Sequence, residues 1–165
     1  MTASCVVAID QGTTNTRVLV VDDQGRIVAR AARELPLLCP RPGWVEQDPE
    51  RIWADTCSLV GESLSDSGRS VLDLAAIGIA NQRETVVLWE RSTGRPVSNA
   101  IVWQDRRTTP MCQRLIADGA GEWVRERTGL VLDPYFSASK IAWLLKSDSE
   151  LRRGADQGDL CAGTI

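Results

Sequence analysis

The amino-acid sequence predicts an α/β fold, in which an antiparallel three-stranded meander is followed by alternating helices and strands. Two short apolar runs rich in β-branched residues, 6–9 and 18–21, flank a polar turn that contains glycine. Asp48 and Pro49 are typical of a helix start, and apolar residues recur after them at helical spacing. The apolar run 74–80 then predicts a buried parallel strand, reached by a crossover from that helix.

The other elements follow from turn signals and from apolar periodicity. Strands are expected at residues 26–38, 85–89 and 97–103, with a turn at 92–94, and a further strand begins at 159–165. Helices are expected at 111–117, at 122–127 and from Ser137 onward, and 147–158 is a polar connection. No linker is strong enough to divide the chain.

Composition excludes several classes of function. The 165 residues are 43% hydrophobic and 25% charged, as in a soluble globular protein. A net charge of −3 without a basic run argues against nucleic-acid binding. The five cysteines show no CxxC spacing, which predicts a reducing, cytoplasmic compartment. The N-terminus lacks the pattern of a signal peptide, and no apolar run is long enough for membrane insertion. The absence of histidine excludes Ser-His-Asp and Cys-His catalysis within these residues.

The turn between the first two strands has the sequence DQGTT, followed by NTR. Gly12 is expected to adopt a positive φ and to bring the backbone close to a ligand. Thr13 and Thr14 offer hydroxyls and amides that can bind an anion, and Arg17 can reach a terminal phosphate. Asp10 is placed to bind hydrated Mg²⁺. The alternative is an ordinary hairpin with a solvated turn, and the absence of Gly-Lys-Ser/Thr excludes a Walker A loop.

Two further groups of residues are candidates for a polyol site. Arg83 and Glu84 follow the predicted parallel strand, at the sheet edge where α/β proteins bind ligands. Their donors and acceptors match vicinal hydroxyls, although a surface ion pair is the alternative. Trp103 offers a flat wall for a carbon chain, or packs in the core. Tyr135 offers its hydroxyl to a ligand, or caps a loop.

Several longer segments carry a resemblance to a known family. DQGTTNTR resembles the first phosphate loop of the actin-like ATPases, which include sugar kinases, Hsp70 chaperones and actin. PGWVEQDPERIW, GIANQRET, ETVVLWERSTGRPVSNAIVWQDRR and TGLVLDPYFSASKIAWLL resemble the FGGY family of carbohydrate kinases, and within it the glycerol kinases. The resemblance covers essentially the whole chain. It implies an RNase H-like, actin-like ATPase domain, of which residues 1–165 are the N-terminal part of domain I, without domain II.

The resemblance also implies an activity and its residues. The expected reaction is phosphorylation of glycerol to glycerol 3-phosphate by ATP, with Mg²⁺. The residues expected to bind ATP and its metal are Asp10, Gly12, Thr13, Thr14 and Arg17, with Asp10 also at the metal. Those expected to bind glycerol are Arg83, Glu84, Trp103 and Tyr135. The chain departs from the family pattern at Asn15 and Thr16, where serines are more usual. It also departs at Asp105, where a Cys or an uncharged residue is more usual.

Glycerol kinases are about three times longer, so the family's catalytic Asp and its adenine-binding domain fall outside the resemblance. No catalytic residue is therefore expected among residues 1–165, and the isolated chain is expected to have no measurable kinase activity. Besides glycerol and ATP, the expected partners are a second copy or a complementing C-terminal half. Two alternatives are a non-catalytic truncated or split-gene product that binds ligand weakly, and an Hsp70-like ATPase module, which the substrate motifs disfavour.

Overall fold

The computed structural model describes residues 4–165, which form two compact units. Unit 1 contains the chain up to Pro36 and Asp48–Gln82, and unit 2 contains Leu37–Gln47 and Arg83–Ile165. The chain passes between the units three times, which explains why no single linker marks the division in the sequence. The prediction about a signal peptide concerns in part residues 1–3, which lie outside the described residues.

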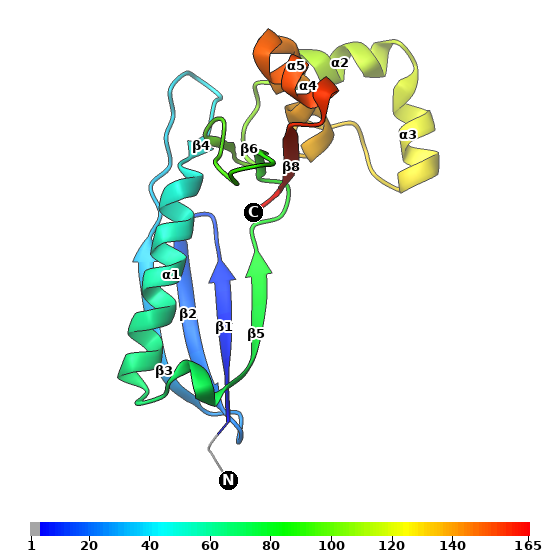
Figure 1. Ribbon diagram of the computed structural model, residues 1–165. Helices are drawn as coiled ribbons and strands as arrows, with labels where there is room; N and C mark the ends of the chain where they lie inside the picture. The colour runs from blue at the N-terminus through cyan, green and yellow to red at the C-terminus, as the bar shows by residue number, and fades with distance from the viewer. Residues whose placement is uncertain (1–3) are drawn as a thin grey trace. The chain divides into compact units, whose positions relative to one another are not determined.

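Unit 1 is a four-stranded sheet with one long helix (Figure 1). In the order β3-β2-β1-β5 the strands are β3 (Ile27–Glu34), β2 (Asn15–Asp22), β1 (Cys5–Gln11) and β5 (Leu74–Asn81). β2 pairs antiparallel with both β1 and β3, whereas β5 pairs parallel to β1. Helix α1 (Pro49–Asp66) and the 3₁₀ turn η1 (Val71–Asp73) make the crossover. The predicted meander and the predicted parallel strand are confirmed.

Asp48 begins α1 as the sequence predicts. One oxygen of its carboxylate accepts hydrogen bonds from the backbone N–H groups of Glu50 at 2.9 Å and Arg51 at 3.3 Å, and Pro49 follows directly. These bonds satisfy two of the amides that have no partner within the first helical turn.

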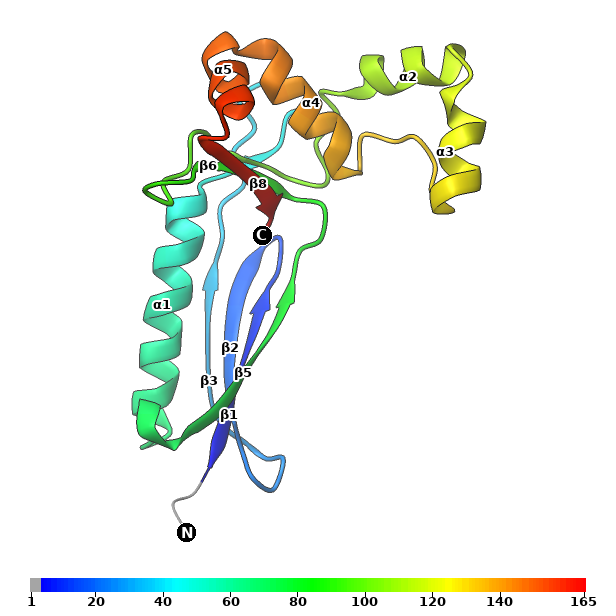
Figure 2. The same cartoon turned by 45° about the vertical axis from the view of Figure 1, so that its right-hand side comes forward.

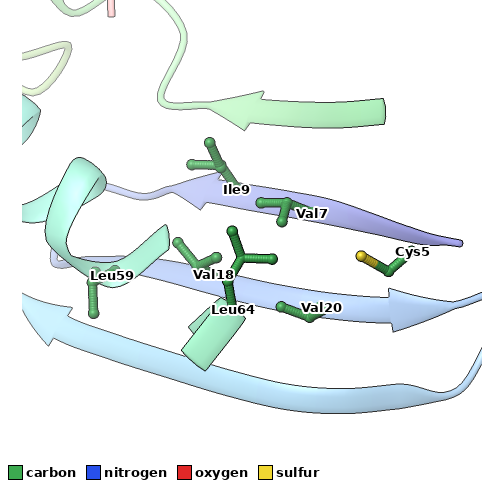
Figure 3. Packing of buried hydrophobic residues seen from close by; sticks show 7 residues of the cluster. All are labelled: Cys5, Val7, Ile9, Val18, Val20, Leu59 and Leu64. Carbon is green, nitrogen blue, oxygen red and sulfur yellow. The ribbon is translucent and has the colours of Figure 1, made fainter. Parts of the chain in front are cut away.

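The core of unit 1 lies between α1 and one face of the sheet (Figure 3). Alternate residues of the strands point toward this face, so that Val7 and Ile9 of β1 pack with Val18 and Val20 of β2. The remaining buried members of the cluster are Cys5, Leu59 and Leu64.

The prediction that β5 is buried is wrong. Ile77 and Ile79 are 53% and 71% exposed. The physical reason is position, because β5 is an edge strand of this sheet and α1 packs on β2 and β3. Apolar composition alone therefore did not indicate how well the strand is covered.

An ion network attaches α1 to the edge strand β3. Arg33 of β3 reaches Asp55 of α1 at 2.9 Å and Glu62 at 2.7 Å, and Arg51 reaches Asp55 at 2.6 Å. Burial raises the pKa of Asp55, but the hydrogen bonds from Arg51 and Arg33 outweigh it and lower that pKa below its usual range. The carboxylate therefore stays charged at neutral pH inside the network.

Unit 2 contains a second, antiparallel sheet with four helices. In the order β4-β7-β6-β8 its strands are β4 (Glu46–Gln47), β7 (Ala100–Ile101), β6 (Val86–Glu90) and β8 (Leu160–Thr164). Its helices are α2 (Thr109–Ala117), α3 (Ala120–Thr128), α4 (Ser137–Ser147) and α5 (Ser149–Gln157). Figure 2 shows α4 and α5 beside β6 and β8, and the buried cluster of Val86, Leu88, Ile101 and Leu144 joins α4 to this sheet.

Unit 2 corrects two predictions. The strand predicted at 97–103 is reduced to the two residues of β7, and the polar connection predicted at 147–158 contains helix α5. Asp148 accepts hydrogen bonds from the amides of Glu150 and Leu151, and Gly158 ends α5 with a φ of 80°. The strand predicted at 159–165 is confirmed as β8. None of the helices formed by residues 4–165 combines the length and the apolar character that a membrane span requires.

Candidate functional site: a phosphate-type loop and a polyol-type cluster

The turn between β1 and β2 closes tightly on itself. The amide of Gly12 donates to the carbonyl oxygen of Asn15 at 2.9 Å, and the amide of Leu35 donates to that of Thr14 at 2.9 Å. The prediction of a positive φ at Gly12 is wrong. Glycine is needed here for space, because a Cβ atom on residue 12 would lie 3.0 Å from the Asn15 carbonyl oxygen.

Gln11 supports this turn, although it was not among the residues predicted for the site. Its side chain is buried, and Oε1 accepts hydrogen bonds from Thr16 Oγ1 at 2.9 Å and from Thr56 Oγ1 at 3.2 Å. Its Nε2 donates to the carbonyl oxygen of Gly12 at 3.3 Å. Gln11 therefore connects β1, β2, α1 and the turn. The available signal was the alternation of β1, which places residue 11 on the same buried face as Val7 and Ile9.

Asp10 and Arg17 face each other across the hairpin. They are paired in the register of β1 and β2, and Arg17 Nη1 lies 3.7 Å from Asp10 Oδ2. Both side chains are about half exposed, so the pair contributes little to stability and is open to a ligand. Thr13 is half-buried and Thr14 is exposed at the tip of the turn. No group of three or more acidic, Cys or His side chains among residues 4–165 forms a metal cluster.

The close contact at Gly12 leads to a prediction about stability. We expect Gly12→Ala to lower the free energy of unfolding by about 1–3 kcal/mol, because the new methyl group must displace a hydrogen-bonded carbonyl. Urea denaturation followed by circular dichroism measures the change. The matched control is Gly61→Ala in the middle of α1, where a Cβ meets nothing within 4 Å. It should instead stabilise the chain by about 0.5–1 kcal/mol. A harmless Gly12→Ala would contradict the tight turn.

Glu84 occupies an unusual backbone position in unit 2. Its φ of 66° lies in the left-handed region, where residues other than glycine are uncommon. Its carboxylate Oε2 accepts hydrogen bonds from Ser137 N at 2.8 Å and Ser137 Oγ at 2.6 Å, at the beginning of α4. The N-terminal end of a helix favours such a negative charge. Arg83 lies in the same turn of the backbone and is exposed.

Two aromatic rings stand next to the start of α4. The ring of Trp103 lies 5.8 Å from that of Tyr135, at an interplanar angle of 65°, and Tyr135 in turn packs edge-on against Phe136 at 5.1 Å. The backbone N–H of Trp103 donates to Thr85 Oγ1, and that of Tyr135 donates to Asp133 Oδ1 at 2.8 Å. Both rings are half-buried, so each presents part of its surface to solvent.

Unit 2 thus brings most of the predicted polyol residues to one place. Trp103 touches Tyr135, and Glu84 bonds to Ser137, which is two residues further along the chain. Arg83 precedes Glu84 directly. The predicted phosphate-loop residues lie in unit 1.

Asp105, which departs from the family pattern, has a clear structural partner. Its carboxylate is completely buried and pairs with the guanidinium of Arg107, whose Nη2 lies 2.8 Å from Oδ2. The carboxylate also accepts hydrogen bonds from the amides of Val45 at 2.6 Å and Arg107 at 2.8 Å. Arg107 reaches Glu46 at 2.7 Å and stacks over the ring of Trp44 at 3.8 Å. The acidic side chain therefore compensates a buried cation.

The sequence of the chain is similar to those of known carbohydrate kinases. The sequence profile described as the FGGY family of carbohydrate kinases, N-terminal domain, matches residues 5–163. Over 97% of its length the chain is 54% identical to a glycerol kinase from Methylibium petroleiphilum and 52% identical to one from Shewanella sp. (strain W3-18-1). It spans about a third of the length of these relatives, namely 32%.

Solved structures show the same fold. The glycerol kinase of Plasmodium falciparum, crystallised with ADP, superposes with a TM-score of 0.90 at 33% identity, over 98% of this chain and 32% of the other. The gluconate kinase of Lactobacillus acidophilus superposes with a TM-score of 0.82 at 23% identity, over 90% of this chain and 30% of the other, which supports the fold alone. The predicted sugar-kinase, actin-like fold is confirmed, and the chain belongs to the FGGY family of carbohydrate kinases.

Proposed function

We propose that this chain supplies the phosphate-binding and polyol-binding residues of a glycerol kinase, which transfers the terminal phosphoryl group of ATP to glycerol. The observation that carries the proposal is the clustering of Glu84, Trp103 and Tyr135 around one turn in unit 2. The identity of about half to curated glycerol kinases supports it. In this proposal residues 1–165 correspond to the N-terminal part of domain I of such an enzyme.

The chemistry of the cluster suits a small polyol. Each hydroxyl group both donates and accepts a hydrogen bond, so it needs an acceptor and a donor in the site. Glu84 offers carboxylate oxygens as acceptors, and Arg83 beside it offers fixed guanidinium donors. The half-buried ring of Trp103 offers a flat apolar wall to the carbon chain, and the hydroxyl of Tyr135 is a further polar group.

The chemistry of the β1–β2 turn suits a phosphate. Phosphoryl transfer depends mainly on positioning and on stabilisation of charge. Thr13 and Thr14 contribute hydroxyls and amides, and Arg17 contributes a cation that leaves its weak pair with Asp10. Asp10 would hold Mg²⁺, which neutralises phosphate charge. We assign no catalytic base among residues 4–165.

The experiment that tests the proposal is a chimera. Residues 5–163 of this chain replace the matching third of the Methylibium petroleiphilum glycerol kinase, and glycerol-dependent release of ADP is measured. We expect turnover in the chimera and its loss by at least about tenfold in the Arg83→Ala chimera, since a charged hydrogen bond is worth roughly 1.5–3 kcal/mol. A folded chimera that binds ATP but shows no glycerol-dependent turnover would refute the proposal.

We further propose that the chain works in a reducing, cytoplasmic compartment, and that its partner is either a second copy or a complementing remainder of the kinase. All five cysteines are free, and Cys39 and Cys57 are exposed, which agrees with a reducing environment. Size-exclusion chromatography of the chain, alone and co-expressed with the remaining part of the relative, separates the two kinds of partner.

The phosphate loop makes its own prediction in the chimera. Arg17→Ala should raise the KM for ATP by about tenfold or more while the KM for glycerol changes little, because the lost cation is expected to face phosphate and not polyol. Initial rates at varied ATP and varied glycerol measure both constants. Arg30→Ala, at an exposed position of β3, is the control and should change neither. An unchanged KM for ATP in the Arg17 variant would remove Arg17 from the site.

A further inference from the structure

Lys140 is a lysine with no exposed surface. It lies in α4, and its relative exposure is 0%. Its Nζ is 2.7 Å from the carbonyl oxygen of Pro134, 2.5 Å from that of Tyr135 and 3.4 Å from that of Phe136. An ammonium group has three donors and no acceptor, so three carbonyl oxygens match its bonding capacity. Lysine is almost never fully buried unless it is paired, and here the three carbonyl oxygens are its partners.

The geometry of α4 explains why this side chain can reach backward. Side chains on a helix lean toward its N-terminus, so a lysine in the first turn extends over the residues that precede the helix. The carbonyls of Pro134 and Tyr135 lie before α4, outside its i to i+4 ladder. Pro134 is buried, and a buried carbonyl without a donor costs free energy. Lys140 therefore supplies the donors that the helix cannot.

The same turn carries both ends of the polyol-type cluster. The carbonyl oxygen of Tyr135 accepts a hydrogen bond from Lys140, and the ring of Tyr135 packs against Trp103. Phe136 precedes Ser137, and Ser137 donates two hydrogen bonds to Glu84. The ammonium group thus binds the backbone segment that carries the phenol ring and leads into the helix end bound by the carboxylate.

We propose that Lys140 is a positioning residue of the polyol site, which holds the 134–136 turn so that Tyr135 and the Ser137–Glu84 contact keep their places. This inference rests on the function proposed above. Full burial excludes direct contact of the ammonium group with a substrate, so the role is exerted through the turn.

The charge of Lys140 is costly where it lies. Burial lowers the pKa of Lys140 from 10.5 to about 8, and the neighbouring acidic groups oppose this shift only in part. Those neighbours are Glu84, Asp105, Asp133 and Cys112. Because the fold favours the neutral amine, raising the pH from about 8 toward 10.5 should not unfold the chain. A neutral amine has two donors for three carbonyls, so its deprotonation near pH 8 should change the hydrogen bonds of the turn.

The first test uses the 165-residue chain and needs no activity. Phe136 is its only phenylalanine, so 4-fluorophenylalanine gives one ¹⁹F resonance from the turn. Lys140→Met should move that resonance toward its value in the urea-unfolded chain, and should abolish a titration step centred near pH 8. Lys146→Met, at the exposed lysine of the same helix, is the matched control and should change neither. An unmoved resonance, or a titration step that persists in Lys140→Met, would overturn the inference.

If Lys140→Met does not fold, NMR titration of the wild-type chain tests the inference. Lysine labelled with ¹³C at Cε gives resonances from the two lysines, Lys140 and Lys146. The Lys140 and Phe136 resonances should change together near pH 8. If the resonances of Lys140 and Phe136 changed with pH independently of each other, the inference would be overturned.

The second test uses the chimera described above and separates this inference from the proposed function. Lys140→Met should raise the KM for glycerol by at least about tenfold and change the KM for ATP by less than about twofold. Lys146→Met is the control. A purely structural role would lower the active fraction and kcat without this split. An inactive wild-type chimera would refute the proposed function and leave the ¹⁹F result to decide on Lys140. An active chimera whose Lys140→Met variant keeps its glycerol KM would overturn the inference.

Discussion

Replacement of Asp105 by alanine is expected to destabilise the protein by about 3–5 kcal/mol, the cost of removing one partner from a buried ion pair. The Asp105 side chain has no exposed surface, and that of Arg107 is 3% exposed. Without the carboxylate, the guanidinium keeps Glu46 and the rings of Trp44 and Trp143. The amides of Val45 and Arg107 lose their acceptor. Urea denaturation followed by tryptophan fluorescence measures the loss, since Trp44 reports on this part of unit 2.

The control for Asp105 is an acidic residue in an exposed pair. Asp156 lies 3.0 Å from Arg152 in α5, and both side chains are more than half exposed. Asp156→Ala should therefore change the free energy of unfolding by less than about 1 kcal/mol. If Asp105→Ala cost no more than Asp156→Ala, the buried pair would not be a main source of stability in unit 2.

Glu84→Ala is expected to lower kcat/KM for glycerol in the chimera by tenfold or more, which corresponds to about 1.4 kcal/mol or more. Two effects combine. The substitution removes acceptor oxygens from the proposed polyol site, and it leaves the Ser137 amide and hydroxyl at the start of α4 without their partner. Initial rates at varied glycerol concentration measure the loss.

Two further variants separate these effects. Glu126→Ala, on the exposed face of α3, should leave kcat/KM for glycerol unchanged. Ser137→Ala removes the hydroxyl contact but keeps the carboxylate of Glu84 in the site, so its loss should be smaller than that of Glu84→Ala. Equal losses in the Glu84 and Ser137 variants would mean that Glu84 acts only by holding α4.

The elements that the sequence predicted well are those whose local pattern agrees with their tertiary setting. The alternation of β1 and β2 exists because α1 covers one face of the sheet, and the start of α1 follows from the capping chemistry of Asp48. Helix α5 was missed because its exposed surface leaves few apolar positions, so only the cap at Asp148 marks its start.

In the candidate site, the side chains suited to a ligand were predicted from the sequence, and the side chains that support them were not. Candidate groups such as Glu84 and Tyr135 could be selected from the sequence because their chemistry suits a ligand and because they lie in segments that resemble the FGGY family. Their supports could not, because buried Gln11 and Lys140 act through hydrogen bonds to residues that propensity rules do not connect to them. A lysine in an amphipathic helix is normally expected at the surface, and only the three converging carbonyls of the 134–136 turn show why Lys140 is inside.

The passage of the chain between the units has a consequence for the order of folding during synthesis. Unit 1 has all four of its strands once the ribosome has made residue 81. Strand β4 of unit 2 has by then already emerged, but it must wait for β7 at residues 100–101, and β6 meets its neighbour β8 only after residue 160. Loop-closure entropy makes such distant pairings slow. Unit 1 should therefore fold first, and the short β4 segment, with its local bridge to Leu38 but without β7, should remain tethered until the rest of unit 2 forms.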